Sequence, residues 1–355
     1  MRKSKRVTIY DIAKKINASP STVSRVLSNS DYPVSPEMRK KVLKAAKEMN
    51  YYPNILARNL KTKNSKNVGI VLPSISNPFY PSVVRGIEDV ALKNDYTLFI
   101  CSCEGNKDRE KKYFQYLMEN LSIGIITIFT DLYTEGIQEF IEHGGVVVSV
   151  CAERVDNSGI CCIYFDKEKE GYMAAKHLID LGHENIAILT PPLTNPLRIG
   201  KVEGYKRALI EAGIAINQDY IYIASEEYAP NYMDTIYECN IASQLTRDLL
   251  QRTPEVTGII CINDIMALGC IAELESHGYR VPEDYSVVGF DDLFLSNLVK
   301  PRLTTVRFEK YNVGRLAMEI LQKIVEGEQR IKQYNFSKYT YLEKRESTGR
   351  PRVKL

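Results

Sequence analysis

The stretch that decides the fold of the amino-terminal end is TIYDIA at Thr8–Ala13, followed by ASPSTVSRVL at Ala18–Leu27. Thr8 can cap a first helix, because the Asp11 carboxylate three residues later can reach back to the amide of the cap. Ser19 can cap a second helix whose first position is a proline, where a missing N–H costs nothing. Two capped helices separated by a short break predict a helix-turn-helix.

The second helix has one apolar and one polar face. Its apolar stripe is expected to be buried, whereas the opposite face carries short hydroxyl and amide side chains that can approach phosphates and base edges. That face also carries Arg25, whose guanidinium can donate two hydrogen bonds to guanine. A third helix is expected from Pro36, after a Ser35 cap, to about Met49. Three short helices around few apolar residues predict a small all-α head, and a trihelical surface subdomain without a DNA-binding role is the alternative.

Charge separates this head from the rest of the chain. Residues 1–66 contain 16 Lys+Arg and 4 Asp+Glu, a net charge of +12, and the remaining residues carry a net −9. The total of +3 therefore hides a basic head on an acidic body. This asymmetry is typical of a nucleic-acid contact and disfavours a solvated, functionless head.

From Asn67 onward, short apolar runs alternate with amphipathic helical stretches. Buried parallel strands are expected at 68–72, 97–101, 123–128 and 146–150, and again at 186–189, 220–223, 258–262 and 286–290. Helices are expected near 79–94, 108–120, 134–143, 168–181, 198–212, 241–252 and 266–277. The repeated alternation predicts two doubly wound α/β lobes, since about 290 residues exceed what one core usually holds.

Motifs along the whole chain resemble one known family. They are TIYDIA at 8–13, SPSTVSRVL at 19–27, YPN at 52–54, ARNL at 57–60, Gly182-His183, Gly204-Tyr205, Asn263-Asp264, VVGFDD at 287–292 and LTTV at 303–306. In this order the motifs resemble the lactose-repressor/galactose-repressor (LacI/GalR) transcription regulators. The resemblance implies a helix-turn-helix head and a body like that of periplasmic binding proteins, with an effector cleft between the lobes whose closure is the allosteric motion.

The resemblance also implies the domain boundaries. The head covers 1–51, and a hinge helix with its linker covers 52–66. The amino-terminal lobe combines 67–165 with 306–327, and the carboxy-terminal lobe combines 166–305 with 328–348. The chain is thus expected to cross between the lobes near 165, 305 and 328.

The residues of the hinge segment themselves predict a short helix. Asn54 can cap a short helix that leaves Leu56 and Leu60 without a local core. The resemblance implies that this helix orders on operator DNA and that Leu60 wedges into the minor groove, while the alternative is a linker helix whose leucines pack on the body. The residues expected to contact DNA are Thr8, Ile9, Ser19, Pro20, Ser21, Thr22, Ser24, Arg25, Asn29, Tyr52, Asn54, Ala57 and Leu60.

Polar residues follow strands of both lobes, where carboxyl ends meet at a shared edge. Asn263 and Asp291 are the strongest effector candidates, because amide and carboxylate groups bind hydroxyls. Asn263 or Asp264 can instead cap the following helix, Asp292 can be a loop charge, and Phe79 can belong to the core. The residues expected to contact the effector are Ser74, Asn77, Phe79, Tyr80, Glu153, Phe165, Arg198, Lys201, Asn263 and Asp291.

Two departures from the family pattern leave the chemical identity of the effector open. Many sugar-responsive members carry arginine where this chain has Lys201, and Glu153 stands where aspartate is commoner. The KVEGYKRAL stretch at 201–209 also resembles the catabolite control protein branch, which is activated by serine-phosphorylated phosphocarrier protein (HPr). A sugar or related metabolite in the cleft is the preferred hypothesis, and docking of phosphorylated HPr is the alternative.

Other classes of protein fit less well. The eight cysteines show no CxxC and no metal spacing, and the basic start lacks the apolar region of a signal peptide. These features argue against a secreted solute-binding protein and predict a cytoplasmic, nucleoid-associated chain without metal or cofactor. No nucleophile, base and orienter pattern indicates an enzyme. A homodimer on a pseudopalindromic operator is expected, rather than a tetramer, because no leucine heptads follow Gln329.

Overall fold

The computed structural model describes residues 7–28, 32–52, 65–129, 134–151, 159–225, 237–328 and 333–352. The chain divides into two compact units, Met1–Ser65 and Lys66–Leu355, which are described here one at a time.

The first unit contains the three predicted helices, α1 (Ile9–Ile16), α2 (Pro20–Leu27) and α3 (Pro36–Glu48). Thr8 and Asp11 form the predicted capping box, and the Ser19 hydroxyl accepts from the Thr22 amide at 3.0 Å. The caps set the residue at which each helix begins. The apolar stripes of the three helices then pack against one another. The core of the unit consists of Ile12, Ala13, Val23, Val26, Val42, Ala45 and Ala46. The helix-turn-helix prediction is confirmed.

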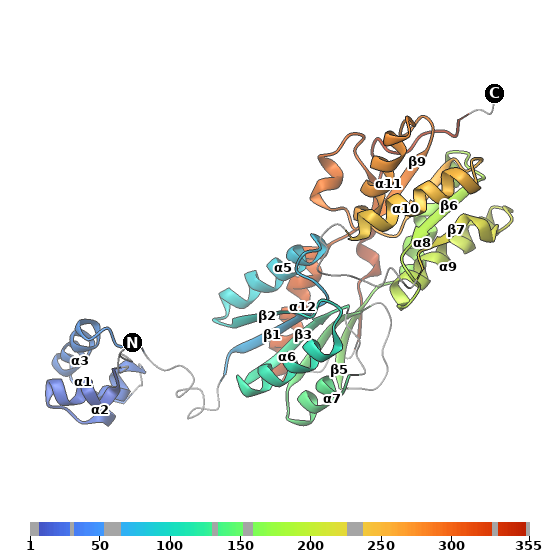
Figure 1. The fold of residues 1–355 in the computed structure, drawn as a ribbon. Coiled ribbons are helices and arrows are strands. Elements are labelled where there is room, and N and C mark those ends of the chain that lie inside the picture. The colour runs from blue at the N-terminus through green and yellow to red at the C-terminus, as the bar shows by residue number, and fades with distance from the viewer. Residues whose placement is uncertain are drawn as a thin grey trace. The chain divides into compact units, whose positions relative to one another are not determined.

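The second unit contains two six-stranded sheets (Figure 1). In the first sheet all neighbours are parallel, in the order β11-β5-β4-β3-β1-β2. Its strands are β1 (Asn67–Leu72), β2 (Thr97–Ser102), β3 (Ser122–Ile128), β4 (Val146–Cys151), β5 (Ile160–Tyr164) and β11 (Gln333–Asn335). The second sheet has the order β12-β10-β9-β8-β6-β7, with only β12 antiparallel to its neighbour. Its strands are β6 (Ile186–Thr190), β7 (Ile221–Ile223), β8 (Gly258–Cys261), β9 (Ser286–Phe290), β10 (Thr304–Phe308) and β12 (Thr340–Glu343).

Helices cover both faces of each sheet, which explains why central strands such as β1, β3, β8 and β9 are almost entirely buried. On the first sheet, α5 (Phe79–Lys93) and α12 (Lys310–Val325) pack on one face, and α6 (Lys107–Glu119) and α7 (Glu135–Glu142) pack on the other. On the second sheet, α8 (Lys167–Asp180) pairs with α9 (Pro196–Glu211), and α10 (Tyr237–Arg252) pairs with α11 (Asp264–Ser276). Two doubly wound lobes are therefore present, as the alternation predicts.

The strand assignments shift two of the expected crossing points. β10 belongs to the second sheet as far as Phe308, three residues beyond the crossing expected near 305. β11 still belongs to the first sheet, so the last passage follows Asn335 and not residue 328. Four strands were not assigned from the sequence, namely β5, β10, β11 and β12. β10, β11 and β12 contain polar residues, and β11 and β12 lie at sheet edges, whereas β5 is a short apolar run that was overlooked.

Two further observations concern the chain as a whole. No helix among the described residues is long and apolar enough to cross a membrane. All the described free thiols except the half-buried Cys239 are buried, as expected from their positions in apolar runs, and burial raises the pKa of Cys101 to about 11.

Candidate DNA-binding surface and effector pocket

The amino end of α2 presents a cluster of hydroxyl groups. The Ser19 hydroxyl lies 2.7 Å from that of Ser21 and 2.8 Å from that of Thr22. Ser19 and Ser21 are exposed, and Thr22 is half-buried. Because the first turn of a helix also offers unpaired backbone N–H groups, this surface is suited to a phosphate oxygen or a base edge.

One turn further along α2, the Arg25 guanidinium lies over the ring of Tyr32, with 3.8 Å between its central carbon and the ring centroid. Tyr32 follows α2 and is 55% exposed. Sequence reasoning did not select Tyr32, because no residue spacing shows which ring a long side chain will cover.

The other predicted DNA contacts are placed as follows. Thr8 and Tyr52 are exposed, and Tyr52 has 75% of its surface accessible. Ile9, Pro20 and Ser24 are half-buried, so each presents only part of its side chain. Four predicted contacts lie outside the described residues, namely Asn29, Asn54, Ala57 and Leu60.

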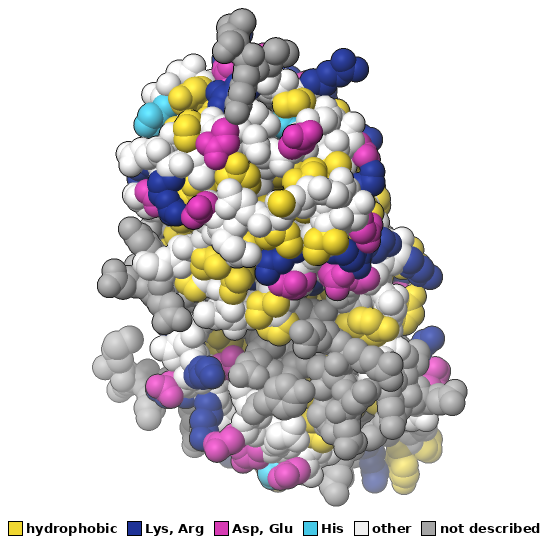
Figure 2. Space-filling view, turned by 90° about the vertical axis from the view of Figure 1, so that its right-hand side faces the viewer, with side chains coloured by type: hydrophobic (Ala, Val, Ile, Leu, Met, Phe, Trp, Pro, Cys, Tyr) yellow, Lys and Arg dark blue, Asp and Glu magenta, His cyan; other side chains and the backbone are white. Residues whose placement is uncertain are grey.

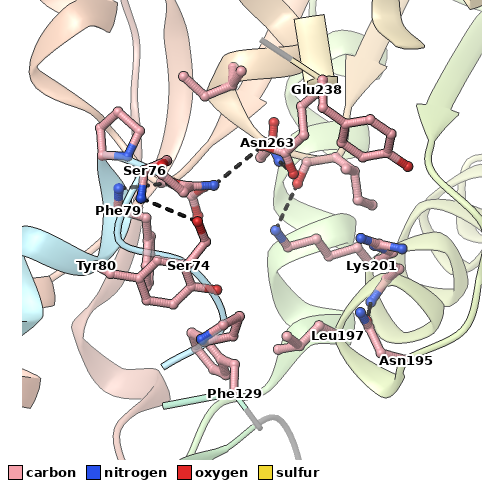
Figure 3. A pocket seen from close by; sticks show the side chains of 18 of the residues that line it. Ser74, Ser76, Phe79, Tyr80, Phe129, Asn195, Leu197, Lys201, Glu238 and Asn263 are labelled. Atoms are coloured by element: carbon pink, nitrogen blue, oxygen red, sulfur yellow. Dashed lines mark hydrogen bonds between the residues drawn. The ribbon is translucent and has the colours of Figure 1, made fainter. Parts of the chain in front are cut away.

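In the second unit, a pocket of about 210 Å³ lies between the loops that follow strands of the two sheets (Figure 3). Side chains from both lobes line it. They include Ser74, Ser76, Asn77, Phe79, Tyr80, Phe129, Lys167, Asn195, Leu197, Arg198, Lys201, Tyr237, Glu238, Ile262, Asn263, Ile265 and Asp291. Eight of the ten predicted effector contacts are in this lining.

The two remaining predictions have different outcomes. Glu153 lies outside the described residues. Phe165 does not line the pocket, because its ring is 2% exposed and packs against Phe308 and Phe336, with centroids 4.9 and 5.8 Å away. An apolar ring at the end of a strand gains more from this aromatic core than from a polar cavity, so the prediction of an effector contact at Phe165 is wrong.

Glu238, in the first turn of α10, joins the two lobes and was missed by sequence reasoning. Its carboxylate accepts from Asn77 Nδ2 at 3.3 Å in the first lobe and from Asn263 Nδ2 at 2.8 Å in the second. Each amide is oriented by its own oxygen, which accepts from the backbone N–H of Phe79 or Met266. Burial raises the pKa of Glu238. A carboxylate thus occupies part of the pocket and bridges it.

Asn263 and Asp264, which are adjacent in the chain, have different roles. Asn263 is both the cap of α11 and a pocket residue. Asp264 is fully buried beneath it and accepts from the Leu293 amide and from the hydroxyls of Ser296 and Thr305. Burial raises the pKa of Asp264 to about 7. Asp264 therefore holds loops together and does not reach the pocket.

Asp291 and Asp292 both have positive φ angles and differ in their partners. Asp292 forms ion pairs with Arg345 and Arg307. Within the described residues the carboxylate of Asp291 has neither a hydrogen bond nor an ion pair, and burial raises its pKa. Asp291 is thus the pocket acceptor that is still available to a ligand.

The pocket cations are already engaged by the protein. Lys201 Nζ donates to the Ile262 carbonyl at 2.9 Å and lies 3.8 Å from Glu170. Lys167 Nζ donates to the same Glu170 at 2.8 Å, and Arg198 donates to the Pro192 carbonyl at 2.8 Å. Because these donors are committed, the pocket offers a ligand mainly acceptors and ring faces. No group of metal-binding side chains occurs in the described part of the chain.

Comparison with known proteins identifies the family. A model for bacterial regulatory proteins of the lacI family matches residues 8–54, and one for a periplasmic binding protein-like domain matches residues 175–348. Catabolite control protein A of Priestia megaterium is 35% identical over 323 residues, covering 91% of this chain and 93% of the relative. The chain belongs to the LacI family. It is therefore a DNA-binding transcriptional regulator, as the resemblance of its motifs implies.

Other relatives and solved structures agree with this assignment. The repressor PurR of Aliivibrio salmonicida is 33% identical over 314 residues, covering 88% of this chain and 91% of PurR. The structure of the lac repressor dimer bound to operator and the anti-inducer ONPF matches with a TM-score of 0.81 at 25% identity, covering 97% of this chain and all of that one. A LacI-family regulator from Enterococcus faecium with bound ribose matches with a TM-score of 0.69 at 26% identity, covering 80% of this chain and 98% of that one. These relatives are transcriptional regulators and not enzymes.

Proposed function

We propose that this regulator is a dimeric repressor that binds a pseudopalindromic operator and responds to a small, hydroxyl-rich effector, most simply a sugar, in the pocket between its lobes. The observation that carries the effector proposal is the pairing of a free acceptor with ring faces in one cavity. Asp291 supplies the acceptor, and Phe79, Tyr80 and Tyr237 supply rings. Sugars combine hydroxyl donors with apolar C–H faces, and so they match this combination.

The charges of the pocket favour a neutral effector over an anionic one. Lys167 and Lys201 are both within 4 Å of Glu170, which leaves little positive charge for a phosphate or carboxylate. Glu238 and Asp291 place two further carboxylates in the lining. A phosphorylated sugar would therefore meet acceptors where it needs donors.

For DNA, we propose that the hydroxyl cluster of α2 and Arg25 read the major groove of each half-site. Arg25 is expected to bind guanine, and the Ser19–Thr22 turn is expected to bind phosphate and a base edge. Leu60, in the hinge, is expected to wedge into the minor groove. The net charge of +12 on residues 1–66 supports this orientation toward DNA.

A second candidate for regulation is a protein partner. The 35% identity with catabolite control protein A supports it, and serine-phosphorylated HPr is the partner that the sequence resemblance implies. Such a partner would act on the lobe surface and leave the pocket empty. Among the described residues on the face shown in Figure 2, basic and acidic side chains are interspersed, without a broad patch of one sign for a phosphoprotein.

Thermal unfolding separates the two candidates. A pocket ligand at a hundredfold excess over its dissociation constant should stabilise the chain by about 2.7 kcal/mol. We expect a neutral monosaccharide or disaccharide from a panel to raise the melting temperature, and the same sugar carrying a phosphate to have no effect. A shift with phosphorylated HPr and none with any carbohydrate would favour the protein partner.

A further inference from the structure

The contact between Arg25 and Tyr32 is the closest approach of a cation to a ring among the described residues. The separation is 3.8 Å, compared with 4.6 Å for Arg207 and Tyr172 and 4.7 Å for Arg352 and Tyr285. At this distance the guanidinium plane can lie against the ring face. Tyr32 thus restricts where the end of the Arg25 side chain can go.

The nitrogen donors of Arg25 are available. Its guanidinium forms no ion pair and no hydrogen bond within the described residues, whereas Arg198, Arg247 and Arg345 in the second unit each donate to protein oxygens. Stacking uses the face of the guanidinium and leaves its N–H edge open. The side chain is therefore held in place without using the donors that would recognise a planar pair of acceptors.

Tyr32 lies outside the apolar core of the head. It is 55% exposed and does not belong to the core cluster around Ile12 and Val42, whereas the nearby Val34 packs against that cluster. The residue stands between α2 and the Ser35 cap of α3, in the connection that follows the helix-turn-helix. An exposed ring in this place, covered by an arginine of the recognition helix, points to a role in orienting that arginine.

We propose that Tyr32 is a positioning residue for DNA recognition, which holds the Arg25 guanidinium by stacking so that its N–H edge meets one base pair of the operator. This inference rests on the proposed role of Arg25 at a base. A free arginine on a helix surface samples many rotamers and loses that freedom on binding. Restriction by Tyr32 lowers this loss, so the stack raises affinity only for duplexes in which Arg25 makes its base contact.

The test uses the full-length chain and a duplex selected by the unmodified protein from a randomised 20-base-pair library. Affinities are measured for this duplex, for variants with each base pair changed, and for an unrelated duplex. Tyr32→Ala and Tyr32→Leu, which both remove the ring, should weaken binding to the selected duplex about two- to fivefold. Both should reduce discrimination at the base pair that depends on Arg25. Tyr32→Phe keeps the ring and should bind as the unmodified protein does.

Three further measurements decide between positioning and other roles. Binding to the unrelated duplex and the salt dependence of binding should not change in the Tyr32 variants, because no phosphate contact is lost. In an Arg25→Ala background, Tyr32→Ala should have no further effect. Equal losses on all duplexes, an undiminished effect without Arg25, or a defect in Tyr32→Phe equal to that of Tyr32→Ala would each overturn the proposal. If Arg25→Ala itself left base preference unchanged, the proposed role of Arg25 would fail first, and the two failures are thus distinguishable.

Discussion

Asp291 and Asp292 are adjacent aspartates in the loop after β9 with opposite surroundings, and they make a matched pair of variants. Asp291→Asn should weaken effector binding about 10- to 100-fold, because it removes a charged acceptor. It should leave the melting temperature unchanged or raise it, since a buried carboxylate without a hydrogen bond is unfavourable in the folded state. Isothermal titration and thermal unfolding measure the two effects.

Asp292→Asn should show the reverse pattern. It breaks a largely buried ion pair with Arg345 and a more exposed one with Arg307, so a loss of roughly 3 kcal/mol in the free energy of unfolding is expected, with effector affinity retained. If both variants lost effector binding equally, the assignment of Asp291 as the ligand acceptor would be wrong.

Because burial raises the pKa of Asp264, we expect the free energy of unfolding to depend on pH. Burial raises its pKa from 3.8 to about 7, although three donors bind it. Between these pH values the folded state holds a proton that the unfolded chain releases, so the free energy of unfolding falls as the pH rises through this window. The fall from this group is about 4 kcal/mol.

The measurement is urea unfolding of the unmodified chain and of Asp264→Asn from pH 4 to pH 8. The difference between the two curves should decrease with pH. The difference is needed because His177, whose pKa burial lowers to about 4, acts in the opposite direction over part of the range. Parallel curves would show that Asp264 is ionised in the folded state throughout.

At the scale of elements, each lobe contains two helices that pack backbone to backbone at glycines. A Cβ on Gly204 of α9 would lie 1.9 Å from the Glu168 carbonyl oxygen of α8, and one on Gly171 of α8 would lie 1.9 Å from the Lys201 carbonyl oxygen of α9. Gly86 of α5 and the facing glycine of α12 make the same arrangement in the first lobe. Backbones can approach this closely only where no side chain stands between them.

Gly204→Ala should therefore destabilise the second unit by about 1–3 kcal/mol and weaken effector binding, because α9 carries Arg198 and Lys201. Urea unfolding and calorimetry measure the two effects. As a control, Lys206→Ala on the same helix removes an ion pair with Glu203 and part of a half-buried side chain, and it should change stability by less than about 1 kcal/mol. Wild-type stability in Gly204→Ala would mean that the two helices can separate at no cost.

At the scale of the whole molecule, an apolar face of the first lobe predicts how two copies meet. Ile75 and Ile100 are 57% and 48% exposed beside a hollow lined also by Val84, and Ile100 lies on the edge strand β2. Exposed apolar side chains at a sheet edge are typical of an interface. We expect a dimer in sedimentation velocity, and we expect Ile100→Asp to give monomers that bind operator DNA more weakly. A stable tetramer, or a dimer unaffected by Ile100→Asp, would contradict this arrangement.

The sequence by itself determined the helices of the head and most elements of the two lobes, because their signals are local. Caps such as Thr8 and Ser19 act within one turn, apolar runs mark buried parallel strands, and the charge of residues 1–66 needs no folded structure to be counted. The same local logic placed Asn263 and Asp291 at the carboxyl ends of their strands, where the pocket lies.

Only the tertiary structure decided which polar groups meet. Glu238 lies 161 residues from Asn77 along the chain, and its bridge across the pocket leaves no trace in sequence spacing. Phe165 was assigned to the pocket from its position at a strand end, but the rings that bury it come from Phe308 and Phe336. In each of the adjacent pairs Asn263-Asp264 and Asp291-Asp292, the burial and partners of the two residues show which one lines the pocket and which one supports the structure. Such distinctions depend on contacts between distant segments, which local propensity does not encode.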